Sequence, residues 1–398
     1  MHDLIREHAR ALAGRLDPDD DRERATARLL DYYQHAAARA EALIARQARP
    51  GPQNPAATQG TIPAAVPALA DSEQALAWAR AERASLLACL DHAIATGQHA
   101  RVVALTAGLA ELLRRDGPWA EAMTRHQAAI EAARQLGDRL GQAGALSDLA
   151  AVRRLKSEYP AAGQILEQAL GIYRDLGDRL GQAHALLDLG DVRRMTDDFP
   201  AAVQDLEQAL GIYRDLGDRL GQANALHRLG DVRRLMDDYP AAVQDLEQAL
   251  GISRDLGYRL GQAHTLLDLG VVRRATGEYP AATRAMEQAL DIYRHLGNRV
   301  GEAEALNESG TLHRATGDLA QAEGCHRQAL DLARAIASPW FEAHALAGLG
   351  RCALAADHAT QAAALLRQAL EIFQHIGTAE ANDVSRELAA LTEAEPPA

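Results

Sequence analysis

Residues 177–216 read GDRLGQAHALLDLGDVRRMTDDFPAAVQDLEQALGIYRDL, and residues 217–256 follow as GDRLGQANALHRLGDVRRLMDDYPAAVQDLEQALGISRDL. Between 171–210 and 211–250 only six of forty positions differ, with no insertion or deletion. A fixed period of this length is typical of a stacked array, in which each unit buries its apolar face against its neighbours. The period is marked by Gly97, Gly137, Gly177, Gly217, Gly257, Gly297 and Gly377, and by Pro160, Pro200, Pro240 and Pro280.

Each unit contains the signals for two helices, called helix A and helix B below. Asp178 is placed to cap helix A, and Gly177 can take the left-handed conformation that ends the preceding helix. Gly190 lets helix B approach closely, and Pro200 suits the first turn of helix B. The expected apolar stripes are Leu186, Leu189 and Val192 on helix A, and Ala202, Leu206, Ala209 and Leu210 on helix B.

The pattern predicts an all-α chain, which is also poor in the aromatic residues that strands favour. We expect the following organisation: N-terminal helices in 1–47, a flexible Pro/Gly/Ala-rich linker in 48–70, one helix forming a half repeat in 71–100 and capped by Asp71, seven units in 101–380, and a capping helix with a tail in 381–398.

Charge and composition disfavour several classes of function. The net charge is −13, and Lys156 is the only lysine, so direct nucleic-acid binding is disfavoured. Three cysteines are too few for a disulfide framework, and the first residues lack the apolar segment of a signal peptide. No apolar run is long enough to span a membrane. We therefore expect a cytoplasmic protein with no membrane partner.

No arrangement of residues typical of catalysis is found. His184, His264 and His344 recur at one position of alternate units and are too far apart to share a metal ion. Cys325 and His326 are adjacent on helix B, where neighbouring side chains diverge, and burial of the cysteine is the favoured interpretation. We expect neither enzymatic activity nor a metal or cofactor.

The residues Leu189-Gly190, Ala202, Leu206 and Ala209 resemble the tetratricopeptide repeat in its forty-residue form, over 101–380. Arg193 replaces the tyrosine usual three residues after the glycine. In the first unit Trp119 stands in the place of Tyr159. The resemblance implies a right-handed α-solenoid of tandem helix-turn-helix repeats with an N-terminal helical extension.

The N-terminal third carries a second resemblance. The segments MHDLIREHARAL, LLDYYQHAAARAEALI and ALAWARAERASLLACLDHA resemble those that follow the nucleotide-binding module in actinobacterial STAND-type ATPases, including large antibiotic-regulatory transcription factors. In those proteins the tetratricopeptide array is the C-terminal sensor. A single lysine cannot complete a GxxxxGK[ST] phosphate loop, so the nucleotide-binding module is not expected here. The resemblance implies a non-enzymatic scaffold serving as the sensor or interaction arm of a bacterial signalling or transcription-regulatory system. The alternative is a stand-alone receptor for a signalling peptide or small molecule.

Tetratricopeptide arrays bind ligands along the concave face lined by helix A, so the resemblance implies a protein or peptide ligand there; self-association is left open. The candidate residues are Arg154, His184, Leu187, Asp191, Arg194, Asn224, His227, Asp231, Arg234, His264, Arg274, Asn307 and Arg314.

The arginines of this set form a column forty residues apart and have two interpretations. The column can grip an acidic or extended segment of a partner, because guanidinium groups suit carboxylates. Alternatively, the arginines pair with Asp191 and Asp231, three residues earlier, as an ion ladder. Five of the six differences between the near-identical units lie in helix A, which fits either adaptation to a ligand or drift after duplication.

Overall fold

The computed structural model describes residues 3–45 and 66–394, and within them every regular element is an α-helix. The predicted fold class, an all-α array of tandem helix-turn-helix repeats, is therefore confirmed. The chain divides into two compact units, Met1–Ile212 and Tyr213–Ala398, and the division falls inside helix α11 (Phe199–Leu216). Each unit is described by itself below.

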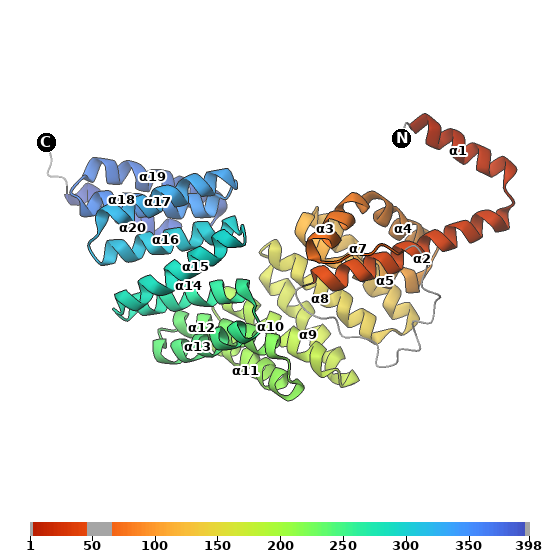
Figure 1. Cartoon of the computed structure of the whole chain (residues 1–398), viewed down its shortest axis with the longest axis horizontal. Helices are drawn as coiled ribbons and strands as arrows, with labels where there is room; N and C mark the ends of the chain where they lie inside the picture. Colours follow the sequence, from red (N-terminus) through yellow and green to blue (C-terminus); the bar gives the residue numbers. More distant parts are fainter. Residues whose placement is uncertain (1–2, 46–65, 395–398) are drawn as a thin grey trace. The chain divides into compact units, whose positions relative to one another are not determined.

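The N-terminal unit begins with helices of uneven length, from 7 residues in α6 to 26 in α2, and continues into regular pairs (Figure 1). Its helices before α11 are α1 (Asp3–Leu16), α2 (Asp19–Ile44), α3 (Ser72–Ala81), α4 (Arg83–Ala95), α5 (His99–Gly108), α6 (Ala110–Asp116), α7 (Trp119–Leu136), α8 (Arg139–Leu155), α9 (Tyr159–Leu176) and α10 (Arg179–Met195).

The C-terminal unit consists of regular helix pairs followed by one last helix. Its helices are α12 (Arg219–Leu235), α13 (Tyr239–Asp255), α14 (Arg259–Ala275), α15 (Tyr279–His295), α16 (Arg299–Ala315), α17 (Leu319–Ala335), α18 (Pro339–Ala355), α19 (Ala359–Ile376) and α20 (Glu380–Ala394). Helix A of successive repeats is α12, α14, α16 and α18, and these helices contact one another in that order.

The predicted capping signals are present. The side chain of Asp178 accepts a hydrogen bond of 2.9 Å from the backbone N–H of Gly181 at the start of α10. Gly177 ends α9 with a φ of 67°, in the left-handed region where glycine carries no Cβ penalty. The turn between the two helices of this repeat places Asp197 at a φ of 60°, which a short polar residue tolerates.

Close helix approach is also confirmed. A Cβ on Gly190 would lie 2.6 Å from Cγ of Leu206 on the partner helix, so any larger residue would force the pair apart. Between repeats, a Cβ on Gly181 would lie 2.3 Å from the ring of Tyr173. The predicted apolar residues are all buried: Leu186, Leu189, Val192, Ala202, Leu206, Ala209 and Leu210.

Helix α2 packs along α3 and α5, so the N-terminal extension is joined to the repeats. Contact is closest at Gly108, where a Cβ would lie 2.9 Å from the Cβ of Ala37. Leu30 and Ala36 are among the residues that α2 buries. Helix α1 stands apart from the other helices of this unit (Figure 1).

The single helix expected within 71–100 is instead two helices, α3 and α4, which meet at Glu82. Asp71 does cap the first of them, by accepting a 2.8 Å hydrogen bond from the N–H of Gln74. A second break, at Leu109, divides helix A of the first unit into α5 and α6. Both breaks lie where α2 makes contact: Tyr33 donates a 2.8 Å hydrogen bond to the carboxylate of Glu82, and Gly108 meets α2 one residue before the other break.

The segments outside the repeats differ from expectation in part. Residues 46–65 of the expected linker lie outside the described residues, but Leu69 packs against the apolar cluster around Ile44 and Ala75. At the other end Val384 of α20 is buried in the same core as Phe373. Among the described residues no helix is both long and apolar enough to cross a lipid bilayer.

Candidate functional site

The predicted binding residues of the N-terminal unit divide between core and surface. Leu187 is only 1% exposed, so it packs within the array and does not face a ligand, which corrects its inclusion among the candidates. Asp191 is also buried, whereas His184 and Arg194 are half-buried. The equivalent position of the next repeat is His227, which is half-buried, so burial at this position differs between repeats and spacing alone could not predict it.

Arg154 is held by the next repeat. Its Nη1 lies 2.6 Å from Oδ1 of Asp188, and its Nη2 lies 2.8 Å from Oδ2 of Asp191. The predicted alternative, an ion pair within one helix, occurs at Arg234, whose Nη2 lies 2.5 Å from Oδ1 of Asp231.

Two further arginines of the column differ from each other. Arg274 reaches Glu308 of the next repeat at 3.2 Å, whereas Arg314 is half-buried and forms no ion pair with any described residue. Since Arg154, Arg234 and Arg274 are each engaged by a carboxylate, the column is not a free basic stripe. The interpretation of the column as a series of ion pairs is supported. However, the ion pairs of Arg154 and Arg274 join successive repeats and do not lie within one helix.

His227, on α12, is joined to helix A of the next repeat. Its Nε2 lies 2.7 Å from Oδ2 of Asp268 on α14. Its ring stacks on that of His264 with centroids 6.2 Å apart and planes at 29°. The ring of His264 in turn lies 5.7 Å from the ring of Tyr293 on α15. The structure thus brings His227 and His264 together, as the candidate list implied, while Asn224 is half-buried nearby on the same helix as His227.

Asn307 belongs to an internal network, which corrects its assignment to the binding face. It is 7% exposed, its Nδ2 donates to the carbonyl of Phe341 at 3.3 Å, and its Oδ1 lies 3.2 Å from Nδ1 of His326. Burial lowers the pKa of His326 to about 4, so the imidazole is neutral and Nδ1 carries the proton donated to Asn307. His326 is 1% exposed and Cys325 half-buried, the reverse of the expected burial.

The central part of the helix-A face in the C-terminal unit forms one polar group, called the helix-A cluster. Its residues lie on the successive helices α12, α14 and α16, and they comprise four carboxylates, two arginines and two histidines. The members are His227, Asp231, Arg234, His264, Asp268, Arg274, Glu304 and Glu308.

Sequence reasoning missed three members, Asp268, Glu304 and Glu308. A signal was available, because Glu304 occupies the position of His184 and His264, and Asp268 and Glu308 occupy the position of Asp188. The position of Asp188 is one at which the near-identical units differ. Following that position into later repeats would have identified the two carboxylates.

The carboxylates of the helix-A cluster titrate differently. Restricted hydration, together with the charges of Asp268, Glu308 and Asp231, raises the pKa of Glu304 to about 7. Burial also acts on Asp268, but the hydrogen bond and charge of His227 hold the pKa of Asp268 below its usual value. Within the described residues no group of three His, Cys, Asp or Glu side chains is arranged to hold a metal ion.

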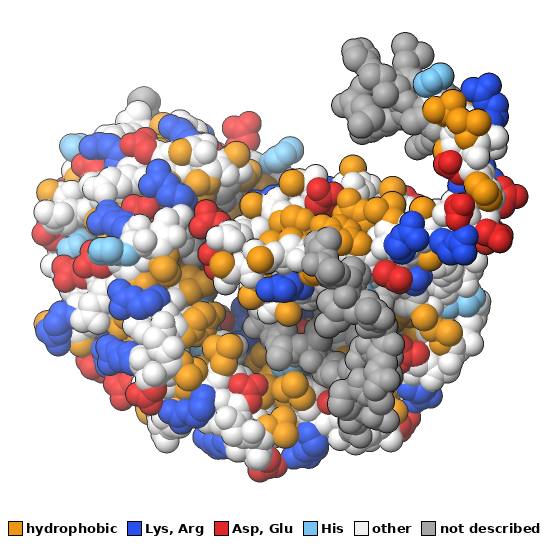
Figure 2. Space-filling model, turned by 45° about the vertical axis from the view of Figure 1, so that its right-hand side comes forward, with side chains coloured by type: hydrophobic (Ala, Val, Ile, Leu, Met, Phe, Trp, Pro, Cys, Tyr) orange, Lys and Arg blue, Asp and Glu red, His pale blue; other side chains and the backbone are white. Residues whose placement is uncertain are grey.

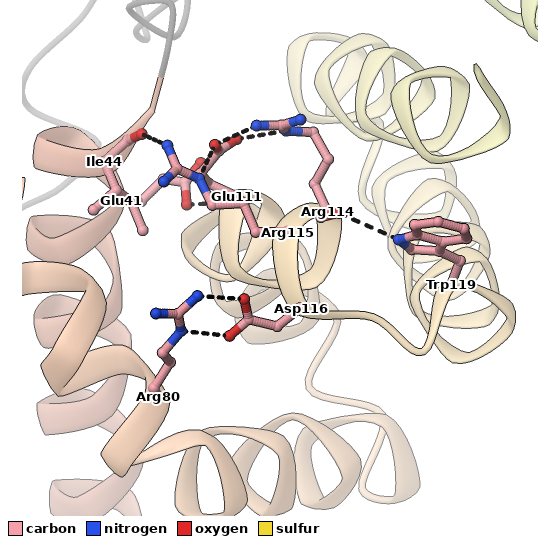
Figure 3. Close-up of polar contacts among 8 residues, drawn as sticks. All are labelled: Glu41, Ile44, Arg80, Glu111, Arg114, Arg115, Asp116 and Trp119. Carbon is pink, nitrogen blue, oxygen red and sulfur yellow. Dashed lines mark hydrogen bonds and ion pairs between the residues drawn. The ribbon is translucent and has the colours of Figure 1, made fainter. Parts of the chain in front are cut away.

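A second polar group lies in the N-terminal unit and is called the N-terminal cluster: Glu41, Arg80, Glu111, Arg114, Arg115 and Asp116 (Figure 3). Glu111 is 6% exposed and accepts hydrogen bonds from Nε of Arg114 at 2.7 Å and from Nε of Arg115 at 2.5 Å. Burial opposes ionisation, but these guanidinium groups hold the pKa of Glu111 below its usual value.

The N-terminal cluster also caps two helices. Leu109 cannot cap α6 with a side chain, and the carboxylate of Glu41 instead accepts the N–H of Glu111 at 3.1 Å. Nη2 of Arg115 lies 3.4 Å from the carbonyl of Ile44 at the last turn of α2. Arg80 of α3 pairs with Asp116 through two hydrogen bonds of 2.7 and 2.8 Å (Figure 3). The cluster therefore fastens α2 and α3 to α6.

Elsewhere charges are mixed. On the face shown in Figure 2, basic and acidic side chains are interspersed, and no large area of one sign is visible.

Comparison with known proteins agrees with the geometry. A family model described as tetratricopeptide repeat matches residues 101–175, 141–215, 221–295 and 301–375, which is more than half of the chain. A comparison with curated proteins found no match.

Several solved structures share the fold. A Rap protein complexed with competence and sporulation factor has a TM-score of 0.55 at 14% identity, covering 80% of this chain and 96% of that chain. The apo quorum sensor NprR from B. thuringiensis has a TM-score of 0.54 at 13% identity, covering 74% and 87%. A signal transduction ATPase with numerous domains (STAND), with a tetratricopeptide repeat sensor, from Pyrococcus horikoshii has a TM-score of 0.52 at 14% identity, covering 79% and 54%.

Proposed function

Because the chain belongs to the tetratricopeptide repeat family, we propose that it is a non-enzymatic scaffold that binds a protein or peptide along the helix-A face. The observation that carries this proposal is the helix-A cluster. It places ionisable side chains from three successive repeats on one accessible face, a span suited to an extended segment more than to a small molecule.

The accessible positions recur from one repeat to the next. His184 is half-buried, and its equivalents Asn224, His264 and Glu304 are half-buried or exposed. The side chain changes in type at each step while the surrounding core stays apolar. A succession of different polar groups on a fixed scaffold is what recognition of one particular segment requires.

A finer proposal concerns the system. We propose that the scaffold is the sensor or interaction arm of a bacterial signalling or transcription-regulatory protein. It is supported by the resemblance of the N-terminal third to STAND-type proteins and by the likeness to the Pyrococcus horikoshii sensor. The docking of α2 on α3 and α5 ties that N-terminal third to the repeats. The likeness to Rap and NprR favours the alternative, a stand-alone receptor for a signalling peptide.

Binding is tested with a random peptide library displayed on phage and selected on the full chain. Enriched peptides are synthesised and titrated by calorimetry against the native chain, against the double variant His227→Ala/His264→Ala, and against Arg327→Gln. Arg327 is 64% exposed on helix B and serves as the control. We expect the double variant to lose binding and the control to keep it. Peptides that bind all three equally, or no enrichment over an unrelated protein, would contradict the proposal.

The signalling role requires that the bound segment favour one shape of the array, because a ligand shifts an equilibrium only by its differential affinity. Small-angle scattering with and without a saturating selected peptide tests this. We expect the two curves to differ. Curves that superimpose would remove the sensor proposal and leave simple binding.

A further inference from the structure

The helix-A cluster has one carboxylate without a partner. Asp231 is paired with Arg234, Glu308 with Arg274, and Asp268 with His227. Glu304 forms no hydrogen bond or ion pair with any described residue, although its side chain is exposed beside the other three carboxylates. Glu304 is therefore the one carboxylate of the cluster that forms no ion pair with its arginines or histidines.

A buried hydroxyl gives an independent sign of an unfilled site. Tyr293 is 0% exposed, yet its hydroxyl has no hydrogen-bond partner among the described residues. Burial and the charges of Glu304 and Asp268 raise the pKa of Tyr293, so the hydroxyl stays protonated beside these two carboxylates. Buried hydroxyls are nearly always paired in folded proteins, and an exception asks for an explanation such as a missing ligand.

The surroundings are suited to a flat cation. His264 lies between the ring of His227 and the ring of Tyr293, which gives aromatic faces beside the carboxylates. A guanidinium group is planar, presents five N–H donors and stacks on aromatic rings. An ammonium group offers three donors around a point and uses the rings less well. A metal ion is not favoured, since no set of ligands within the described residues is arranged to hold one.

We propose that the helix-A cluster of the C-terminal unit binds an arginine side chain of the partner segment, with the guanidinium group between the carboxylates of Asp268 and Glu304 and beside the hydroxyl of Tyr293. This inference rests on the proposed function, because it names the chemistry of the segment that the face recognises. It also reverses the expectation that the arginine column selects an acidic segment. Those arginines serve to hold neighbouring carboxylates in place.

The test uses peptide pools in which one position is fixed and the others are randomised. The fixed residue is arginine, lysine, citrulline or glutamate. Citrulline has the shape of arginine without the charge. Binding of each fluorescent pool to the full chain is measured by polarisation. We expect the arginine pool to bind about tenfold more tightly than the citrulline pool, the magnitude of a charge-assisted, bidentate contact.

Single-residue variants identify which side-chain groups cause the preference for arginine. Glu304→Gln removes the unpaired charge, and Tyr293→Phe removes only the hydroxyl. The matched control is Glu287→Gln, an exposed glutamate on helix B of the same repeat as His264. We expect the first variant to abolish the preference for arginine over citrulline, the second to reduce it several-fold, and the control to leave it unchanged. Circular dichroism melts verify that each variant is folded.

The outcomes separate this inference from the proposed function. If arginine and citrulline pools bind equally well, and binding still depends on His227 and His264, the face binds a segment but the arginine assignment is wrong. Equal binding of the lysine and arginine pools would overturn the assignment of a guanidinium group. If no pool binds above the level of an unrelated protein, the proposed function itself fails.

Discussion

The N-terminal cluster and the helix-A cluster are built from the same kinds of residue, arginines and carboxylates on neighbouring helices, but they are completed differently. In the first, Glu111 is buried and accepts hydrogen bonds from two arginines, while Arg80 and Asp116 satisfy each other. In the second, Glu304 is exposed and unpaired, and the hydroxyl of Tyr293 is buried without a partner.

On the proposed function, this difference distinguishes a cluster that stabilises the fold from a cluster that binds a ligand. A cluster whose hydrogen bonds are all made within the chain stabilises the fold and has nothing left to offer a ligand. A cluster with an unpaired charge and an unpaired hydroxyl is less favourable by itself and gains from an added group. The same substitution should therefore cost stability in the first region and binding in the second.

The largest effect is expected at Glu111. Replacement by glutamine removes the buried charge that half-buried Arg114 and exposed Arg115 share, and should lower the free energy of unfolding by about 2–3 kcal/mol. Urea denaturation measures the loss, and hydrogen exchange of α2 and α6 locates it. Glu131→Gln, at a residue 57% exposed on α7, is the control. A loss at Glu111 no larger than in that control would end the distinction between the two clusters.

The next effect is a pH dependence of opposite sign in the two clusters. The pKa of Glu304 is raised in the folded state to about 7, so its ionisation opposes folding and stability falls as pH rises through this range. Glu304→Gln should therefore stabilise the chain at about pH 8, by about 1 kcal/mol once solvent screening of an exposed group is allowed for, and the gain should vanish below about pH 5. The groups that act on Glu304 are His227, Asp231, Asp268 and Glu308, with Tyr293 beside them.

For Glu111 the sign is reversed. Its pKa is lowered in the folded state, so its contribution is present above the usual glutamate value and is lost as pH falls through the folded pKa. Thermal unfolding followed between about pH 4 and pH 8 checks both signs. A Glu304→Gln gain that did not change with pH would contradict the account of that carboxylate.

The last comparison is between two tyrosine hydroxyls. Tyr33 donates to the carboxylate of Glu82, so Tyr33→Phe should cost about 1–2 kcal/mol, the usual contribution of a partly buried hydrogen bond to a charged group. The hydroxyl of Tyr293 makes no such bond and is buried, so Tyr293→Phe should cost no stability and can raise it by about 1 kcal/mol. Chemical denaturation of both variants gives the comparison. Equal losses would show that the hydroxyl of Tyr293 has a partner within the chain.

Much of the fold could be predicted because its signals are local and repeat. Gly177, Asp178 and Gly190 act within one helix pair, and forty-residue spacing repeats the evidence for each. The breaks at Glu82 and Leu109 could not be predicted, since each depends on α2, a helix distant in sequence. Gly108 precedes the break at Leu109, but one glycine within a helical pattern does not by itself predict a break, and neither glycine nor proline adjoins Glu82.

The candidate site was predicted only in part. His227 and His264, both predicted for the helix-A face, stack on each other. Leu187 and Asn307 share the repeat position of His227 but are buried, which the forty-residue spacing could not show. Spacing within one helix also suggested that arginines pair three residues back, whereas Arg154 reaches across to Asp188. Glu304 was missed because a carboxylate occurs there in one repeat, whereas the equivalent position holds a histidine in alternate repeats.

The central claim is that Glu304 is open to an arginine of the ligand, whereas Glu111 is satisfied within the chain, and carboxylate footprinting tests it most directly. The full chain is treated with a carbodiimide and an amine, once alone and once with a saturating arginine-containing peptide from the selected pool. Mass spectrometry then measures labelling at Glu304 and at Glu111. The account predicts that Glu304 is labelled in the free chain and protected by the peptide, while Glu111 is unlabelled in both states. Labelling of Glu304 that is unchanged by the bound peptide would contradict the claim.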